Sequence, residues 1–454
     1  MATFRIFIML SALFLTASLS YGADLDERLK ALEEVSKQQQ KVIEEQQRLI
    51  EGLKQDLNKL QAGEPQKSTE TQVLELKEKV DQVAEAQTRT IPSVFNPAIG
   101  FVGEAVFSYR SKGASLTGSS RPGGFDAFAR SVELNAAASV DPFAKAYIVA
   151  NASADAATGE ATFSIEEAAL QTESLPGNLT VKAGRFFGEF GRLAYIHDHE
   201  LPFVNRPLVL AQYIGGESRT DGVQLNWLVP IEHYVSLTVG AGNQFGGDVP
   251  PNNVGDFRRA GGLNYWGRLS SYVDITPDIS LEPGVSGLWN PKTVDRGGSF
   301  TQPDGSTLSE RERRLTGVDL TLSYKPLRDN QFTSIIWGTE VLYSHNRYDE
   351  VNSDGLAFSR DIGSYGLYSY LAYKFHRQWS AGFLYGFVED AQDNTARTYE
   401  YSPFITWSLS HWNQLRLQYT YTNHNAVSGL RPDNAVYLQW AWIIGAHSHG
   451  WQQR

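Results

Sequence analysis

Polar and apolar side chains alternate through most of the chain after residue 95. Residues 413–421 read Asn-Gln-Leu-Arg-Leu-Gln-Tyr-Thr-Tyr, so every second position from 415 to 421 is leucine or tyrosine and the positions between are polar. Because successive side chains point to opposite faces of a strand, this run predicts a strand with one apolar and one polar face. Similar runs at 223–227, 235–239, 318–325 and 436–444 help bring the strand candidates after Ile99 to about 16.

The repetition of such strands predicts an all-β fold, a transmembrane antiparallel β-barrel of about 16 strands with lipid outside and water inside. The connections alternate in length, which is typical of such barrels. Tight turns alternate with longer polar connections near 110–125, 188–219, 245–259, 291–313, 346–361 and 424–433. A soluble β-sandwich is the alternative, but it does not explain this alternation. An even strand number would place both barrel ends on the short-turn, periplasmic side.

The N-terminal residues predict export and a coiled coil. Residues 1–22 have the pattern of a secretory signal peptide, with Arg5 before an apolar stretch and small residues before a cut at Ala23. The apolar stretch is short for the alternative, an uncleaved anchor helix. Residues 23–62 carry leucine along a heptad seam at positions 25, 32, 53 and 60, which predicts a self-associating α-helical coiled coil.

The remaining domain boundaries follow from these patterns. A linker and a second short helix are expected at 63–94, the barrel at 95–447 and a C-terminal tail at 448–454.

Composition narrows the function classes. The chain of 454 residues contains no cysteine, which excludes disulfides and cysteine nucleophiles, and its net charge of −11 argues against nucleic-acid binding. Neither Gly-x-Ser-x-Gly nor His-Glu-x-x-His is present. We therefore expect no enzymatic activity and no cofactor.

A barrel of about 16 strands leaves an aqueous channel, and its predicted lining is polar with both signs of charge. The residues expected to face the lumen are Glu104, Glu133, Lys182, Asn226, Arg268, Glu282, Asp319, Thr321, Lys325, Arg416 and Gln418. Strict alternation places the adjacent carboxylates of Glu166 and Glu167 on opposite faces of their strand. Aromatic girdles at the lipid interfaces are expected to include Trp407, Trp412, Tyr437 and Trp440.

The longest loop follows a strand that reads Val-Lys-Ala-Gly-Arg-Phe-Phe at 181–187 and runs about 30 residues to Thr220. This ending in Gly184-Arg185, together with the strand rhythm, resembles Gram-negative 16-stranded trimeric outer-membrane porins. Among these, the layout of residues 24–446 is most similar to porins with an N-terminal coiled coil, such as the phosphate-selective porins O and P.

The resemblance implies a trimer, a third external loop that folds into the lumen and constricts it, and passive diffusion of small solutes. The chain departs from the group in two respects. Inward bases are few and comparable in number to acids, which argues against phosphate specificity. Porins usually end in an aromatic residue, whereas here residues 447–454 extend past the last strand.

The string His197-Asp198-His199-Glu200 within the long loop is the one cluster that suggests chemistry. Two histidines in His-x-His spacing share one side of an extended segment, and flanking carboxylates would complete a site for zinc or another divalent ion. A polar loop tip that hydrogen-bonds the barrel wall is the alternative.

The residues predicted to form a pore constriction are Arg185, Arg192, His197, His199, Glu200 and Arg206, and the candidate metal ligands are His197 and His199. Salt bridges that hold the loop in place would use the same arginines.

The predicted function is passive diffusion of small hydrophilic solutes or ions through a water-filled barrel. The alternatives are a substrate- or zinc-linked transporter that uses His197 and His199, and an envelope tether that acts through the coiled coil. Expected partners are outer-membrane lipid and lipopolysaccharide, further copies of the chain in a homotrimer, small hydrophilic solutes, and the cell wall through the coiled coil. The expected location is the outer membrane of a Gram-negative bacterium, with the coiled coil in the periplasm.

Overall fold

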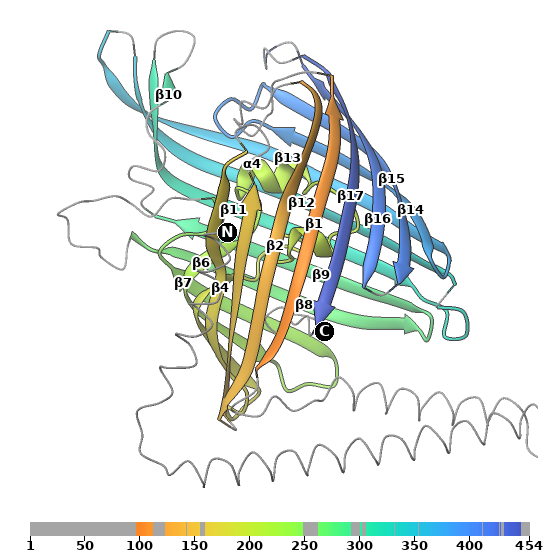
Figure 1. The fold of residues 1–454 in the computed structure, drawn as a ribbon. Helices are drawn as coiled ribbons and strands as arrows, with labels where there is room; N and C mark the ends of the chain where they lie inside the picture. The colour runs from red at the N-terminus through yellow and green to blue at the C-terminus, as the bar shows by residue number, and fades with distance from the viewer. Residues whose placement is uncertain are drawn as a thin grey trace, which may run out of the picture. The chain divides into compact units, whose positions relative to one another are not determined.

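The computed structural model describes residues 97–111, 123–141, 143–154, 159–247, 262–291, 300–301, 306–330, 332–352, 354–410, 412–425, 427 and 431–445. The predicted signal peptide, coiled coil, second short helix and C-terminal tail lie outside these residues. Within them the chain forms a single antiparallel sheet that closes on itself (Figure 1). No helix in this part of the chain is long and apolar enough to span a membrane.

Sixteen long strands and one short strand make up the described sheet. The first half contains β1 (Ala98–Arg110), β2 (Gly124–Asp141), β3 (Ala144–Ala154), β4 (Ala161–Thr172), β5 (Leu179–Phe187), β6 (Arg219–Leu228), β7 (Tyr234–Gly242), β8 (Asn264–Thr276) and β9 (Ile279–Asn290). The second half contains β10 (Phe300–Thr301), β11 (Thr307–Tyr324), β12 (Ser334–Val351), β13 (Ala357–His376), β14 (Trp379–Glu389), β15 (Arg397–Ser410), β16 (Asn413–His424) and β17 (Asp433–Gly445).

The first and last long strands pair with each other. Strand β1, orange in Figure 1, lies antiparallel to the dark blue β17 in a register that runs from Gly100 opposite Gly445 to Arg110 opposite Ala435. Strand β9 pairs directly with β11, so the two-residue β10 is an addition to the loop between them. The closed antiparallel barrel of 16 strands confirms the all-β barrel part of the predicted fold and excludes the β-sandwich.

Side-chain burial is the reverse of that in a soluble protein. In β11, Val318 is 58% exposed on the outer face, whereas Asp319 and Thr321, on the inner face, are each only 2% exposed. The same inversion recurs around the barrel, which is the arrangement expected for an apolar outer band and a polar interior. All eleven residues predicted to face the lumen lie on this inner side, either buried or lining an internal cavity.

The aromatic residues at the short-turn ends of the last strands mostly face outward. Trp407 stacks on Trp379 with ring centroids 5.7 Å apart, and Trp412 and Trp440 are half exposed. The prediction was wrong for Tyr437, which is buried on the inner side because it alternates with outward Val436 and Leu438.

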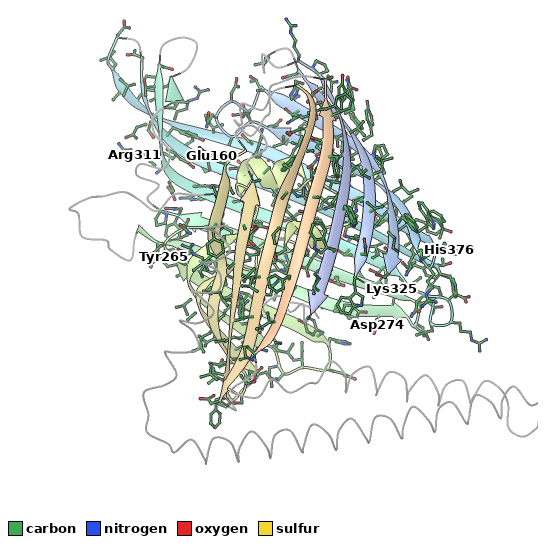
Figure 2. The ribbon with its side chains drawn as sticks, viewed as in Figure 1. Glu160, Tyr265, Asp274, Arg311, Lys325 and His376 are labelled. Carbon is green, nitrogen blue, oxygen red and sulfur yellow. The ribbon has the colours of Figure 1, made fainter. Side chains whose placement is uncertain are left out.

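The predicted alternation of short turns and longer connections is present, with two corrections. Strand β11 begins at Thr307, so the connection expected at 291–313 ends at residue 306. Strand β12 continues to Val351 and β13 begins at Ala357, so the expected loop at 346–361 is reduced to residues 352–356. The strands are long because their pairing continues from Val351 opposite Ala357 down to Ser334 opposite Lys374. Figure 2 labels His376, Lys325 and Asp274 toward the short-turn end, and Arg311 and Glu160 toward the opposite end.

Barrel height differs between the two sides. Strands β11, β12 and β13 have 18, 18 and 20 residues, whereas β5, β6 and β7 have 9, 10 and 9. Strand β5 pairs with β4 over only four residues of each strand, 168–171 with 182–185. The backbone pairing between β4 and β5 is therefore confined to the part of β4 near the short-turn end.

Candidate functional site

Residues 188–218, which connect β5 to β6, lie inside the barrel. They contain a short 3₁₀ helix, η1 (Asp198–Glu200), and the helix α4 (Leu208–Tyr213). The fully buried apolar side chains of this loop are Phe190, Leu193, Ala194, Leu201, Phe203, Val204, Val209, Leu210, Tyr213 and Ile214. Burial of each large side chain stabilises the loop in this position by about 1.5–3 kcal/mol relative to its exposed state, so the loop is firmly packed against the barrel wall.

The wall provides a matching apolar surface beneath the loop. It is formed by inward residues that include Tyr147, Trp266, Leu288, Leu315, Leu342, Tyr370, Leu384 and Phe404. The ring of Phe203 meets those of Tyr370 and Phe404 edge-on, with centroids 5.5 and 6.1 Å away. The alternation of residues along the strands predicted a polar lining, and this apolar surface was not anticipated.

Hydrogen bonds join the loop to strands on several sides of the barrel. The backbone N–H of Val204 donates to Oε1 of Gln418 in β16 at 2.7 Å, and Nη1 of Arg130 in β2 donates to the Val204 carbonyl at 2.6 Å. Further bonds link the loop to Gln224 in β6, Ser286 in β9, Glu340 in β12, Glu389 in β14 and Glu400 in β15. The loop therefore crosses the lumen from wall to wall.

Two β-bulges supply charged groups to the loop contact. Arg130 is an extra residue of β2 opposite β1, and Glu166 is an extra residue of β4 opposite β3. An inserted residue reverses the alternation beyond it, so two consecutive side chains point the same way. The carboxylates of Glu166 and Glu167 consequently both turn inward, and the prediction that they lie on opposite faces was wrong.

The two histidines of the loop meet carboxylates from the wall rather than those beside them in the sequence. Nδ1 of His199 lies 3.2 Å from Oε1 of Glu133. Nδ1 of His197 lies 3.4 Å from Oε2 of Glu166 and 3.7 Å from Oε2 of Glu133. All four residues are buried.

The second nitrogen of His197 is engaged as well. Nε2 of His197 lies 2.9 Å from Oε1 of Glu167, whose other oxygen accepts a hydrogen bond of 2.9 Å from the Tyr147 hydroxyl. Because an ionised carboxylate only accepts, Nε2 carries a proton. Burial lowers the pKa of His197, but Glu133, Glu166 and Glu167 outweigh it and hold the pKa of this loop histidine well above its ordinary value.

The other predicted site residues separate into different locations. Arg185 is on the outer face of the barrel, opposite Ala168 and Asp221, and forms an ion pair with Asp221 at 2.7 Å. Arg206 is buried and braces the loop internally, with Nε 3.0 Å from Asp198 and Nη2 donating to the Ile196 carbonyl at 2.6 Å. Glu200 ends the 3₁₀ helix η1.

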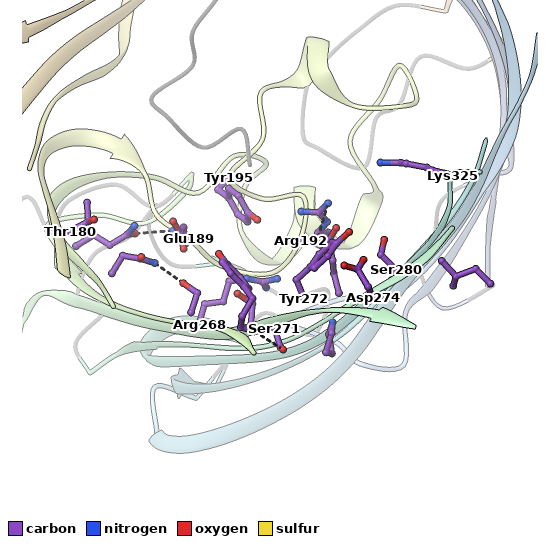
Figure 3. A pocket seen from close by; sticks show the side chains of 18 of the residues that line it. Thr180, Glu189, Arg192, Tyr195, Arg268, Ser271, Tyr272, Asp274, Ser280 and Lys325 are labelled. Atoms are coloured by element: carbon purple, nitrogen blue, oxygen red, sulfur yellow. Dashed lines mark hydrogen bonds and ion pairs between the residues drawn. The ribbon is translucent and has the colours of Figure 1, made fainter. Parts of the chain in front are cut away.

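Arg192 lines a polar cavity of about 560 Å³ between the loop and strands β5 to β9 (Figure 3). Its Nη2 lies 3.2 Å from Oε2 of Glu282, and both side chains are partly exposed to the cavity. Figure 3 shows Tyr195 and Glu189 beside it on the loop, with Tyr272 and Arg268 on the wall.

The cavity lining balances its charges. The cationic side chains are Lys182, Arg192, Arg268 and Lys325, and the acidic ones are Glu189, Asp274, Asp278 and Glu282. Arg268 is held by two hydrogen bonds to Asp319, at 2.6 and 2.9 Å. The lining has four bases against four acids, and one of the bases, Arg268, is already paired with Asp319, so the cavity has no excess of cations and lacks the row of cations that phosphate binding requires.

Sequence comparison gives a distant relative. No protein-family profile matches the chain. An uncharacterised protein of Aquifex aeolicus is 25% identical over 336 residues, covering 70% of this chain and 68% of that protein.

Comparison of folds is more informative. The outer-membrane channel DcaP of Acinetobacter baumannii aligns with a TM-score of 0.50 at 12% identity, covering 77% of this chain and 97% of that one. OprB of Pseudomonas putida aligns with a TM-score of 0.51 at 11% identity, covering 77% and 94%. The barrel of this chain therefore shares its fold with these two proteins, one of which is an outer-membrane channel.

Proposed function

We propose that this protein is an outer-membrane porin through which small hydrophilic solutes diffuse passively, and that residues 188–218 set the width and charge of the channel. The observation that carries the proposal is the position of this loop. It lies within a barrel of a size that otherwise leaves an aqueous channel, and it leaves a polar cavity at its short-turn side.

We propose a revised set of constriction residues, chosen by which side chains line the cavity. Arg192 stays in the set, because it faces the cavity together with Glu282. His197, His199 and Arg206 are buried and inaccessible to a passing solute, and Arg185 faces outward. We add Glu189, Tyr195 and Arg268 to the lining that a solute meets.

Balanced charge supports a channel with weak ion preference. Selectivity in such pores arises from width and from the charges at the narrowest level. With four bases and four acids around the cavity, the lining carries no net charge that would favour either cations or anions. Three tyrosines, Tyr195, Tyr234 and Tyr272, add flat surfaces suited to polar organic solutes.

A homotrimer is part of the proposal, and the outer face of β3 supports it. By alternation this face carries Ala144, Ala146, Ile148, Ala150, Ala152 and Ala154. Small side chains let another surface approach closely, and here they lie beside the incompletely paired wall between β4 and β5.

The alternatives receive less support. A transporter that releases zinc from the loop histidines would need them accessible, whereas His197 is 1% exposed. The tether depends on the predicted coiled coil, which lies outside the described residues.

Single-channel recording tests the function. The full chain, purified in detergent and added to a planar bilayer, should give stable conductance steps, in groups of three if it is a trimer. A matched variant lacking residues 190–216 should give larger steps with preserved β-sheet content. Absence of steps from correctly folded protein would refute a diffusion channel and leave a structural role.

A further inference from the structure

We propose that Glu133, His197 and His199, with Glu166 as a fourth donor, form a binding site for a divalent transition-metal ion of the zinc class. The ion would link the loop of residues 188–218 to strands β2 and β4. This assignment is independent of whether the barrel conducts.

The donor atoms have the spacing of a coordination shell. Donor atoms that each lie about 2.0–2.1 Å from a tetrahedral zinc ion are about 3.3–3.4 Å apart. Nδ1 of His197 lies 3.4 Å from Oε2 of Glu166 and 3.7 Å from Oε2 of Glu133. Nδ1 of His199 lies 3.2 Å from the other oxygen of Glu133, Oε1, so Glu133 offers one oxygen to each histidine. The two His197 separations exceed ordinary hydrogen-bond lengths of about 2.7–3.2 Å. One ligand atom from each of Glu133, His197 and His199 falls within 4.8 Å of the other two.

Outer contacts orient these groups as they do in metalloproteins. Metal-bound histidines usually donate their second ring N–H to a carboxylate, which fixes the tautomer. His197 meets this condition, since its Nε2 donates to Glu167, which the Tyr147 hydroxyl orients in turn. Asn151 donates to Oε1 of Glu166 at 2.6 Å, leaving Oε2 of Glu166 directed toward His197.

Charge favours a cation at the same point. Glu133, Glu166 and Glu167 are at most 8% exposed, and buried carboxylates are costly unless cations lie beside them. With Nε2 of His197 donating to Glu167, Nδ1 faces two carboxylates. Either a proton or a metal ion on Nδ1 is needed to make that contact favourable.

The donor set and its burial define the kind of site. Two imidazoles with carboxylates suit zinc and neighbouring transition metals, whereas magnesium and calcium take oxygen ligands. Since His197 and Glu133 are 1% and 3% exposed, the ion would exchange slowly with the lumen. A structural ion, rather than a transported one, follows from that burial.

The chain has a second His-x-His string, His447-x-His449, near the C-terminus. A zinc-binding measurement must therefore use protein in which this second string has been replaced. Untagged full-length protein carrying His447→Ala and His449→Ala is stripped with a chelator and dialysed against zinc, and bound zinc is measured by mass spectrometry. We expect one zinc per chain. The variant His199→Asn should lose it, whereas His376→Ala, at an exposed turn, should keep it (Figure 2).

Two further measurements guard against a misfolded variant. Cobalt added to the metal-free parent should give the visible absorption of a tetrahedral ion with nitrogen and oxygen ligands. This measurement needs no substitution of a site residue. Glu167→Gln should retain the site but weaken its zinc affinity about 10–100-fold.

The alternative is that the histidine is protonated and hydrogen-bonded to the carboxylates, with no metal ion bound. In that case the folded parent would take up no zinc and give no cobalt spectrum, and the proposal would be overturned. Full zinc uptake by folded His199→Asn would do the same.

Discussion

Replacing Arg192 by alanine should make the channel markedly more cation-selective. The substitution removes a positive charge from the cavity wall and leaves Glu282, its partner at 3.2 Å, without that cation. The local balance of four bases and four acids becomes three against four. Passing cations are then attracted and passing anions repelled.

The magnitude follows from the cavity dimensions. A volume of about 560 Å³ equals that of a sphere about 5 Å in radius, so an ion near its centre lies roughly 6 Å from a wall charge. At the dielectric constant of water, that distance gives about 0.7 kcal/mol per unit charge. Because the effect has opposite signs for cations and anions, the difference of about 1.4 kcal/mol changes the cation-to-anion ratio by up to about tenfold.

Reversal potentials in a potassium chloride gradient measure this ratio. The shift should be large near 0.1 M salt, where the Debye length is about 10 Å, and small near 1 M, where it is about 3 Å. Arg185→Ala is the matched control, since this arginine lies on the outer face, and it should leave the ratio unchanged. Arg192→Ala combined with Glu282→Gln should return the ratio toward that of the parent. An unchanged ratio in Arg192→Ala at low salt, or an equal shift in Arg185→Ala, would refute the assignment of the lining.

Two predictions concern stability, measured as the midpoint of urea unfolding in lipid vesicles. Arg130→Ala removes the cation that pairs with Glu104, which is 1% exposed, and should lower the free energy of unfolding by about 3–5 kcal/mol. Arg130→Lys should recover part of that free energy. Val318→Arg puts a charge on the outward face of β11, near the middle of the roughly ten residues that cross the membrane, and should cost about 2–4 kcal/mol. Val318→Leu should be nearly neutral, and equal costs for the two Val318 variants would contradict a lipid-facing position.

Period-two alternation was sufficient to predict most of the barrel. It identified the strand number and the inward face, because a one-residue error in phase would place an entire strand's polar side chains in lipid. The same rule failed at Glu166 and Glu167, where an inserted residue reverses the phase. A bulge depends on the pairing partner, and one strand's sequence alone does not specify it.

The loop contact was only partly predictable. The string of histidines was visible, but their partner Glu133 is more than sixty positions away, and only the folded barrel brings them together. A usable signal was present in the strands. Leu342, Leu384 and Phe404 occupy the polar phase of their strands, which indicates that something apolar covers them from inside.

Unequal strand length gives the mouth of the barrel a slope. At about 3.3 Å per residue and a tilt near 40°, the 20 residues of β13 rise roughly 50 Å, whereas the 9 residues of β5 rise about 23 Å. The rise of the shorter strand falls slightly short of an apolar band about 25 Å tall, whereas the longer strand extends roughly 25 Å beyond that band. In the proposed outer-membrane location, the upper part of β13 therefore extends above the apolar band while β5 does not.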